Sequence, residues 1–328
     1  MQGARIDSLQ IASPFVLRTV EPSVASLAGQ TVTSVERLGK RVVIGTSEAT
    51  YLVIHLMIAG RFHWFDADSG SSADSGTEST AGSSDVKRAD SSTGSSASGN
   101  TGASAHADSR TDSRSRSRKK PPAGKQLLAA IRFSTGTLYL TEAGSKRRAS
   151  IYLLGGRTEL DAMNPGGLEV LEADRDSFIA RVREQNHTLK RTLTDPRILS
   201  GIGNAYSNEI LHRARLSPML LSQKVDDDVL SRLYNAIRDV LDEWIVRLRD
   251  ARNQGDGFPD KVTAFRPDMA VHGQYNKPCP VCDSPVQRIV YANNETNYCA
   301  SCQTGGVVLK DRALSRLLKD SWPSRLES

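Results

Sequence analysis

All four cysteines of this 328-residue chain lie in one stretch, CPVCDSPVQRIVYANNETNYCASC. They form two Cys-x-x-Cys pairs, Cys279 with Cys282 and Cys299 with Cys302, separated by sixteen residues. This spacing is typical of a structural zinc site, in which four thiolates complete a tetrahedron. Two disulfides are the alternative, but the chain shows no secretory signal, which favours a reducing compartment. We therefore predict one structural Zn²⁺ with no open coordination position for catalysis.

A short β-hairpin must hold the two cysteine pairs together. Val286 to Val290 can pair with Asn297 and Tyr298 across a turn at Asn293-Asn294. An element this small buries too little apolar surface to fold alone, so we expect the metal to stabilise it. Any chemistry must then come from residues elsewhere in the chain.

The second informative stretch is the turn Gly201-Ile202-Gly203-Asn204. Glycines let the backbone approach another chain closely, and free amides at the start of a helix bind anions. Asn204 adds a neutral donor, and Lys190 lies on the preceding predicted helix. Taken alone, the turn fits a simple helix–turn–helix corner equally well. Beside a zinc hairpin, on a chain of formal charge +6 and pI about 9.2, it predicts a nucleic-acid grip.

Apolar alternation predicts β structure on both sides of a low-complexity insert. The predicted strands are 31–35, 42–44, 51–56, 127–133, 137–141 and 150–154. From Ala67 to Gly124 the chain is rich in Ser, Gly, Thr and Asp, with Val86 as its one large aliphatic residue. Such a segment cannot bury enough surface to order itself, so we expect disorder. Its basic end, RTDSRSRSRKK, could contact phosphates or be a solvated tail.

Helical periodicity begins after a Gly/Pro-punctuated linker at 155–171. The predicted helices are 174–185, 189–193, 205–214, 226–249 and a last short one at 311–319. The fold class is therefore α+β with two domains. The predicted boundaries are 1–156 for the β domain with its insert at 66–124, 157–255 for the helical domain, 256–306 for the zinc hairpin and 307–328 for the tail.

Hydropathy gives no sign of a membrane protein. No apolar run approaches membrane-spanning length, and residues 1–10 lack a signal-peptide core. We expect a soluble protein that acts in the cytoplasm. Its mildly basic balance fits a polyanionic partner without establishing one.

Several motifs together resemble one family. The run KRTLTDPRILSGIGNAYSNEILHRARLSP (190–218) resembles the helix–two-turn–helix of the formamidopyrimidine-DNA glycosylase/endonuclease VIII family. Four further stretches agree, namely YCASCQ (298–303), GGLEVL (166–171), VHGQYNKPC (271–279) and HLMIAGRF (55–62). The resemblance leaves out the insert, the extreme N-terminus and the tail beyond about 304. It implies a monomer with an incomplete N-terminal β-sandwich-like domain, a helix–two-turn–helix domain and a four-cysteine zinc β-hairpin.

The resemblance also implies a function in DNA repair. Family members remove oxidised or ring-opened bases from double-stranded DNA and then nick the abasic site. The damaged nucleotide is flipped out, because its C1′ is otherwise unreachable. An N-terminal proline amine attacks C1′ to form a Schiff base, elimination follows, and an adjacent glutamate manages the protons. A bacterial-type protein acting on the nucleoid is expected.

Residues carried over from the family divide into phosphate contacts and an organising position. Lys40 matches a β-domain lysine that contacts DNA phosphate. Lys190 and Asn204, with Gly203, match phosphate contacts of the helical domain. Glu209 matches an acidic position for which an organising role is expected rather than a chemical one.

Three DNA-contact positions depart from the family pattern. The family's zinc-hairpin arginine, which binds phosphates, falls at Asn294. Asparagine is neutral and cannot make the charged two-donor contact of a guanidinium. The methionine wedge that fills the vacated stack falls at Ile58, an apolar replacement. The Arg–Phe pair falls at Arg148 and Ala149, which removes an aromatic wedge.

The start of the chain departs as well. Met1 is followed by Gln2-Gly3-Ala4 in place of the family's Pro-Glu, and the first recognisable stretch is Ile11 to Leu27. We therefore expect a truncated or mis-started N-terminus, no visible catalytic residue and little glycosylase activity for this polypeptide. The leading hypothesis is a damaged-DNA glycosylase/AP lyase. The alternatives are a non-catalytic protein that binds damaged DNA or abasic sites and a zinc-stapled RNA-binding module.

Overall fold

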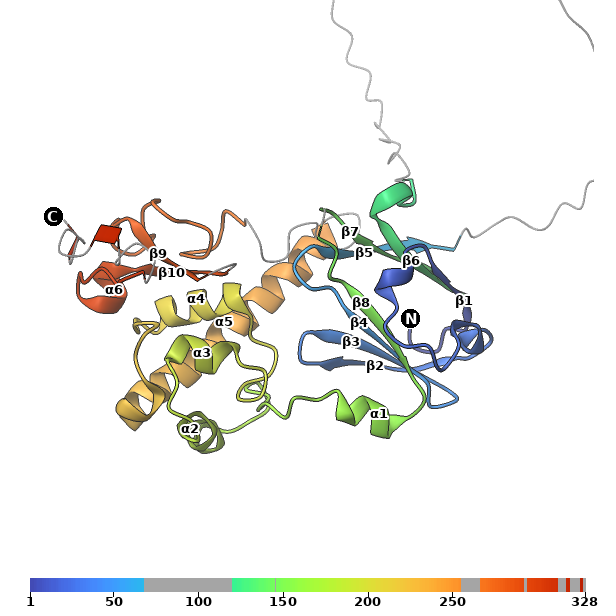
Figure 1. Cartoon of the computed structure of the whole chain (residues 1–328), viewed down its shortest axis with the longest axis horizontal. Coiled ribbons are helices and arrows are strands. Elements are labelled where there is room, and N and C mark those ends of the chain that lie inside the picture. The colour runs from blue at the N-terminus through green and yellow to red at the C-terminus, as the bar shows by residue number, and fades with distance from the viewer. Residues whose placement is uncertain are drawn as a thin grey trace, which may run out of the picture. The chain divides into compact units, whose positions relative to one another are not determined.

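In a computed structural model of the chain (Figure 1), the described residues are 1–67, 120–144, 146–254, 266–291, 294–311, 317–318 and 325–326. The insert that was expected to be disordered lies almost entirely outside these ranges. So does most of the helix expected at 311–319.

Two four-stranded antiparallel sheets make up the N-terminal half. One sheet, in the order β2-β3-β4-β8, contains β2 (Val32–Leu38), β3 (Arg41–Thr46), β4 (Tyr51–His55) and β8 (Ser150–Leu154). The other, in the order β1-β6-β7-β5, contains β1 (Ile6–Ile11), β5 (Gly60–Asp66), β6 (Leu127–Phe133) and β7 (Gly136–Glu142). Both β5 and β6 pair with β7, so the insert joins two strands of one sheet.

One apolar cluster lies between the two sheets. Ile44, Leu52 and Ile54 come from one sheet, and Ile131 and Leu140 come from the other; each is at most 1% exposed. Burying an aliphatic side chain of this size contributes about 2 kcal/mol. The sandwich is therefore a firm support from which its connecting turns project.

Four short 3-10 helices are also described, three in the N-terminal half and one among the later helices. They are Pro14–Val16, Val24–Leu27, Gly124–Gln126 and Ser222–Lys224.

Helices dominate the chain after β8. They are α1 (Arg157–Ala162), α2 (Arg175–Arg183), α3 (Leu189–Thr194), α4 (Asn204–Arg213) and α5 (Asp227–Gln254). Side-chain caps fix two of the starts. The Asp174 carboxylate accepts the Ser177 amide at 2.7 Å, and the Thr188 hydroxyl accepts the Arg191 amide at 3.3 Å.

The apolar stripe predicted for the longest of these helices is a packing face. Leu230, Leu233, Ile237, Val240 and Trp244 of α5 are all buried in the core of the helical half. Among the described residues, no helix combines the length and apolarity needed to cross a membrane.

The cysteine stretch folds as predicted. Strands β9 (Val286–Tyr291) and β10 (Asn294–Cys299) form an antiparallel hairpin, and α6 (Ala300–Thr304) follows directly. Gly305, at φ 62°, ends α6 in the left-handed conformation that glycine adopts at least cost.

Two local expectations were wrong. Residues 155–171 are not only a linker, because α1 forms within them and buries Leu160 against Val43 and Val53. Gly155 and Gly156 precede this helix and Asn164-Pro165 follow it. These residues are typical of loops, so the sequence pattern around so short a helix indicates a linker. The β structure also begins before the first predicted strand at 31–35, with β1, whose Ile6 and Leu9 are buried.

Candidate metal centre and nucleic-acid interface

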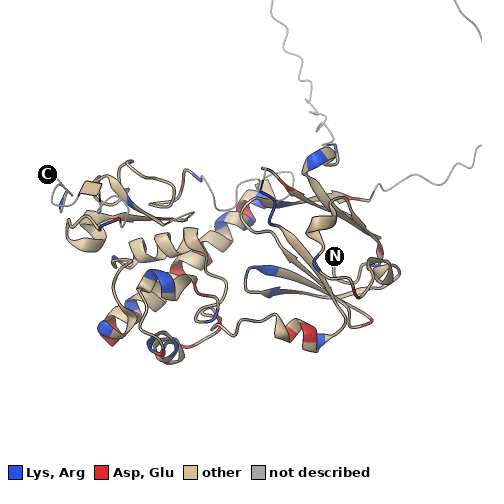
Figure 2. Ribbon diagram, viewed as in Figure 1, with Lys and Arg blue, Asp and Glu red and all other residues tan. Residues whose placement is uncertain are grey.

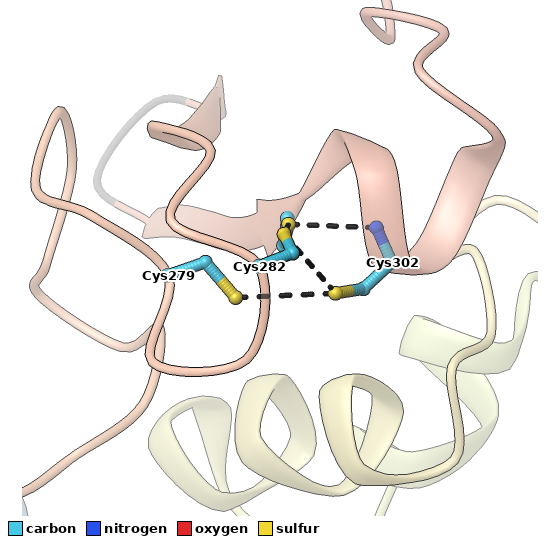
Figure 3. A group of neighbouring side chains, drawn as sticks. Cys279, Cys282 and Cys302 are labelled. Atoms are coloured by element: carbon cyan, nitrogen blue, oxygen red, sulfur yellow. Dashed lines mark hydrogen bonds between the residues drawn. The ribbon is translucent and has the colours of Figure 1, made fainter.

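The four cysteine sulfurs converge at the base of the hairpin, all within 4.8 Å of one another. Figure 3 labels three of them, Cys279, Cys282 and Cys302. The Sγ–Sγ distances are 3.9 Å for Cys279–Cys302 and 3.4 Å for both Cys282–Cys299 and Cys282–Cys302. A tetrahedron with Zn–S bonds of about 2.3 Å has edges of about 3.8 Å. The donor set and its spacing therefore fit one zinc ion.

Without metal, burial favours the protonated, neutral form of two of these thiols. It raises the pKa of the Cys302 thiol to about 11 and also raises the pKa of Cys299. Zinc binding must therefore release protons from these thiols, because only thiolates coordinate the ion.

Helix α4 anchors the zinc hairpin. The Glu209 carboxylate, 6% exposed, accepts the backbone amides of Ala270, Val271 and His272 at 2.8, 3.0 and 2.8 Å. A buried carboxylate needs such charge-assisted bonds to offset its lost hydration. Glu209 therefore organises the approach to the zinc site, in keeping with the role expected for it.

Asn204, the first residue of α4, makes a second connection. Its side-chain amide donates to the Glu295 carbonyl of β10 at 2.9 Å, so the tight turn is tied directly to the hairpin. Gly203 precedes the helix in extended conformation at φ −112°. A side chain at this position would point toward Lys40, because its Cβ would lie 3.8 Å from the Lys40 Nζ.

Lys190 projects from α3 onto the first turn of α4. Its ammonium donates to the Asn204 carbonyl at 3.0 Å, the Ser207 hydroxyl at 2.7 Å and the Asn208 side-chain oxygen. The residue is half-buried, and burial lowers the pKa of Lys190 to about 7. An approaching anion would favour the charged form and raise that pKa again.

A groove of about 680 Å³ opens beside this lysine. Its basic and ring-nitrogen groups come from Lys40, His187, Lys190 and Arg191, and none of the described residues that line it is an aspartate or glutamate. Figure 2 shows Lys and Arg at the β2–β3 turn and on α3. A groove with this lining attracts an anion.

Five of the predicted DNA contacts lie at this one groove. Lys40, Lys190, Gly203, Asn204 and Asn294 all line it. The Lys40 ammonium lies 3.4 Å from the Ile202 carbonyl, and burial, followed by the charge of Arg41, lowers the pKa of Lys40. Asn294 is exposed at the first position of β10.

The other two predicted contacts, Ile58 and Arg148, lie on the sandwich. His55 at the end of β4 pairs with Ser150, and Gly60 at the start of β5 pairs with Glu142. The turn that carries Ile58 and the loop that carries Arg148 therefore leave the same edge of the sandwich. Ile58 is 65% exposed at its turn.

The Glu142 carboxylate fixes the backbone of that loop. It accepts the amides of Arg148, at 2.9 Å for the closer oxygen, and of Ala149, at 3.0 Å. Ala149 is 3% exposed, so this position offers no wedge to a partner. The Arg148 side chain is exposed beside it.

Sequence reasoning missed the residues that organise the groove. The Asn208 side-chain nitrogen lies 3.0 Å from the Nδ1 of His272. The side-chain oxygen of Asn208 accepts a hydrogen bond from the Lys190 ammonium. The one sequence signal for this arrangement is the four-residue spacing of Asn204, Asn208 and His212, which places all three on one face of α4.

Comparisons with known proteins match this architecture part by part. The formamidopyrimidine-DNA glycosylase N-terminal domain matches residues 1–112, the H2TH domain of the same enzymes matches 167–252, and the zinc finger found in FPG and IleRS matches 276–305. The first match starts at residue 1, so the extreme N-terminus belongs to the resembling region after all. The cysteine cluster is thus a structural zinc site.

Individual relatives agree. An uncharacterised formamidopyrimidine-DNA glycosylase-like protein of Mycobacterium tuberculosis is 35% identical over 166 residues, which are 51% of this chain and all of that protein. The formamidopyrimidine-DNA glycosylase of Thermus thermophilus is 38% identical over 134 residues, 39% of this chain and only about half (49%) of the enzyme.

A solved structure extends the likeness to nearly the whole fold. The Lactococcus lactis Fpg in complex with DNA containing an abasic site superimposes with a TM-score of 0.66 at 17% identity. The superposition covers 93% of this chain and 94% of that one.

Proposed function

The chain belongs to the formamidopyrimidine-DNA glycosylase family, and from that premise we propose that it acts in base-excision repair on duplex DNA. Its substrate is a duplex that carries an oxidised or ring-opened base or an abasic site. The reaction class is that of the family, base removal followed by strand cleavage at the abasic sugar. The proposal includes action as a monomer on the nucleoid of a bacterial cell, in the cytoplasm.

One observation carries the proposal, the groove beside α4. Cationic side chains from the β2–β3 turn and α3 meet the zinc hairpin there, with no carboxylate among the described lining residues. Phosphates of a DNA strand are anions that suit a groove lined in this way. Lys190 and Lys40 supply charge, while the amide start of α4 and Asn204 supply neutral donors.

The sandwich edge has a second role in the proposal. A flipped nucleotide leaves a gap in the stack, and an apolar side chain that enters it offsets part of the unstacking cost. Ile58, 65% exposed at the tip of a turn, suits that position, and the neighbouring Arg148 can contact the opposite strand. Because Ala149 offers no aromatic group, the gap is filled less completely and less of the unstacking cost is offset. Binding should therefore favour duplexes whose base is already missing, since their unstacking cost is smallest.

Schiff-base chemistry needs an amine beside the bound strand. Among the described residues that line the groove, Lys40 offers one, and burial, followed by the charge of Arg41, lowers its pKa. Lys40 is therefore the residue to test for a covalent intermediate.

The test is incubation of the zinc-loaded polypeptide with an abasic-site duplex, with and without borohydride. Tighter binding of the abasic duplex than of an intact one is the expected result. Borohydride trapping that Lys40→Met removes would assign the nucleophile to Lys40, and trapping that survives this substitution would exclude it. Equal retention of RNA hairpins and abasic DNA would overturn the proposed function.

A further inference from the structure

The zinc ligand Cys279 has a polar neighbour outside the cysteine cluster. The His212 imidazole of α4 places its Nε2 3.3 Å from Cys279 Sγ. The two residues are 7% and 0% exposed. Burying an imidazole costs hydration that an apolar side chain of similar size would not lose, so packing alone gives no reason for a histidine here.

The chemistry of the site fixes the direction of this contact. A zinc-bound cysteine is a thiolate, which can only accept a hydrogen bond. The facing Nε2 must therefore carry the proton and donate it. Polar partners behind metal ligands orient the ligand and tune its charge.

Helix α4 connects this contact to the groove. Asn204, Asn208 and His212 recur every four residues and so lie along one face of the helix. In that order they bond the Glu295 carbonyl, the His272 ring and the Cys279 sulfur. The first two also provide oxygens for the Lys190 ammonium.

From this arrangement we propose that His212 is a positioning residue: it holds the Cys279 thiolate against α4 and so links zinc retention to the geometry of the Lys190 groove. The zinc part stands on the contacts alone. The effect on DNA rests on the proposed function.

Two variants separate the hydrogen bond from packing. His212→Phe keeps a ring but removes the donor, whereas His212→Gln keeps an N–H at a similar reach. In a chromogenic-chelator assay on the full chain, His212→Phe should hold zinc about tenfold less tightly, within the range seen for such partners. His212→Gln should remain close to the parent protein.

Cobalt substitution gives a readout that packing would not move. Loss of the N–H···S bond should shift the thiolate-to-cobalt charge-transfer band of His212→Phe to lower energy and leave that of His212→Gln in place. Unchanged bands and unchanged zinc retention in a folded His212→Phe would overturn the proposal.

Should His212→Phe fail to fold, the cadmium-substituted parent protein decides the matter. NMR should show scalar coupling between the metal and the His212 Nε2 proton, and its absence would overturn the proposal. Abasic-duplex binding is measured in parallel. If the parent protein retains zinc through His212 but binds no DNA, the proposed function fails while the positioning role stands.

Discussion

The residues proposed to contact DNA lie in two regions with opposite construction. Around α4, the two central charged groups are already engaged: Lys190 donates to three oxygens and Glu209 accepts three amides. At the sandwich edge, Ile58 and the Arg148 side chain extend into solvent from turns. The first region is organised before DNA arrives, whereas the second can adapt to it.

This difference predicts how substitutions should behave. A change around α4 should affect stability and DNA binding together, because the same bonds serve both. A change at the sandwich edge should affect recognition alone.

Zinc removal should produce the largest effect. Structural zinc contributes binding free energy of order 10 kcal/mol in small zinc domains, and here the hairpin otherwise has only two small clusters of buried residues. Hydrogen exchange should show residues 271–304 losing protection after chelation, while β3 and β4 of the sandwich keep theirs. Equal loss in both regions would erase the distinction between them.

Glu209→Gln should come next. The substitution keeps the shape but replaces charge-assisted bonds to three amides, which should cost about 2–3 kcal/mol in urea unfolding. Glu36→Gln is the matched control in the sandwich, because Glu36 makes only an exposed ion pair with Arg157. The control should cost less than about 1 kcal/mol, and similar costs for the two variants would count against the account.

Lys190→Ala should weaken binding to all duplexes alike. Removing one phosphate contact should also reduce the slope of log affinity against log salt by about one. Lys224→Ala, an exposed lysine outside the groove, is the control and should change neither. An unchanged slope in Lys190→Ala would remove this residue from the phosphate contacts.

The same lysine predicts a pH effect with two opposite signs. Its folded-state pKa, about 7, lies below its ordinary value of 10.5, so the cost of keeping it charged is present below pH 7. Stability should therefore rise between pH 7 and 10.5 as that cost is relieved. DNA affinity should fall over the same interval, by at most about tenfold per pH unit, because phosphate favours the ammonium. Lys190→Ala should show neither trend.

Ile58→Ala should have the smallest effect and the most selective one. At 65% exposure, its loss should change the free energy of unfolding by no more than about 0.5 kcal/mol. Discrimination between abasic and intact duplexes should fall by about 1 kcal/mol. Ile44→Ala, a fully buried change in the same domain, should instead cost about 2–5 kcal/mol of stability.

Sequence reasoning reached the parts of this molecule whose determinants are local. Cysteine spacing predicted the sulfur cluster, and alternation located most strands, because both patterns act over a few residues. It missed α1, which depends on a single buried leucine between glycine and proline signals. It could not see that Asn208, Glu209 and His212 face segments some sixty residues away, since that depends on which face of α4 meets the hairpin.

Equilibrium binding of the zinc-loaded chain to abasic and intact duplexes across a salt series measures lesion preference and phosphate contact together. The abasic duplex should bind more tightly, and its affinity should fall steeply with salt, with Lys190→Ala flattening the fall. Salt-independent affinity, or equal affinity for the two duplexes, would contradict the proposed function.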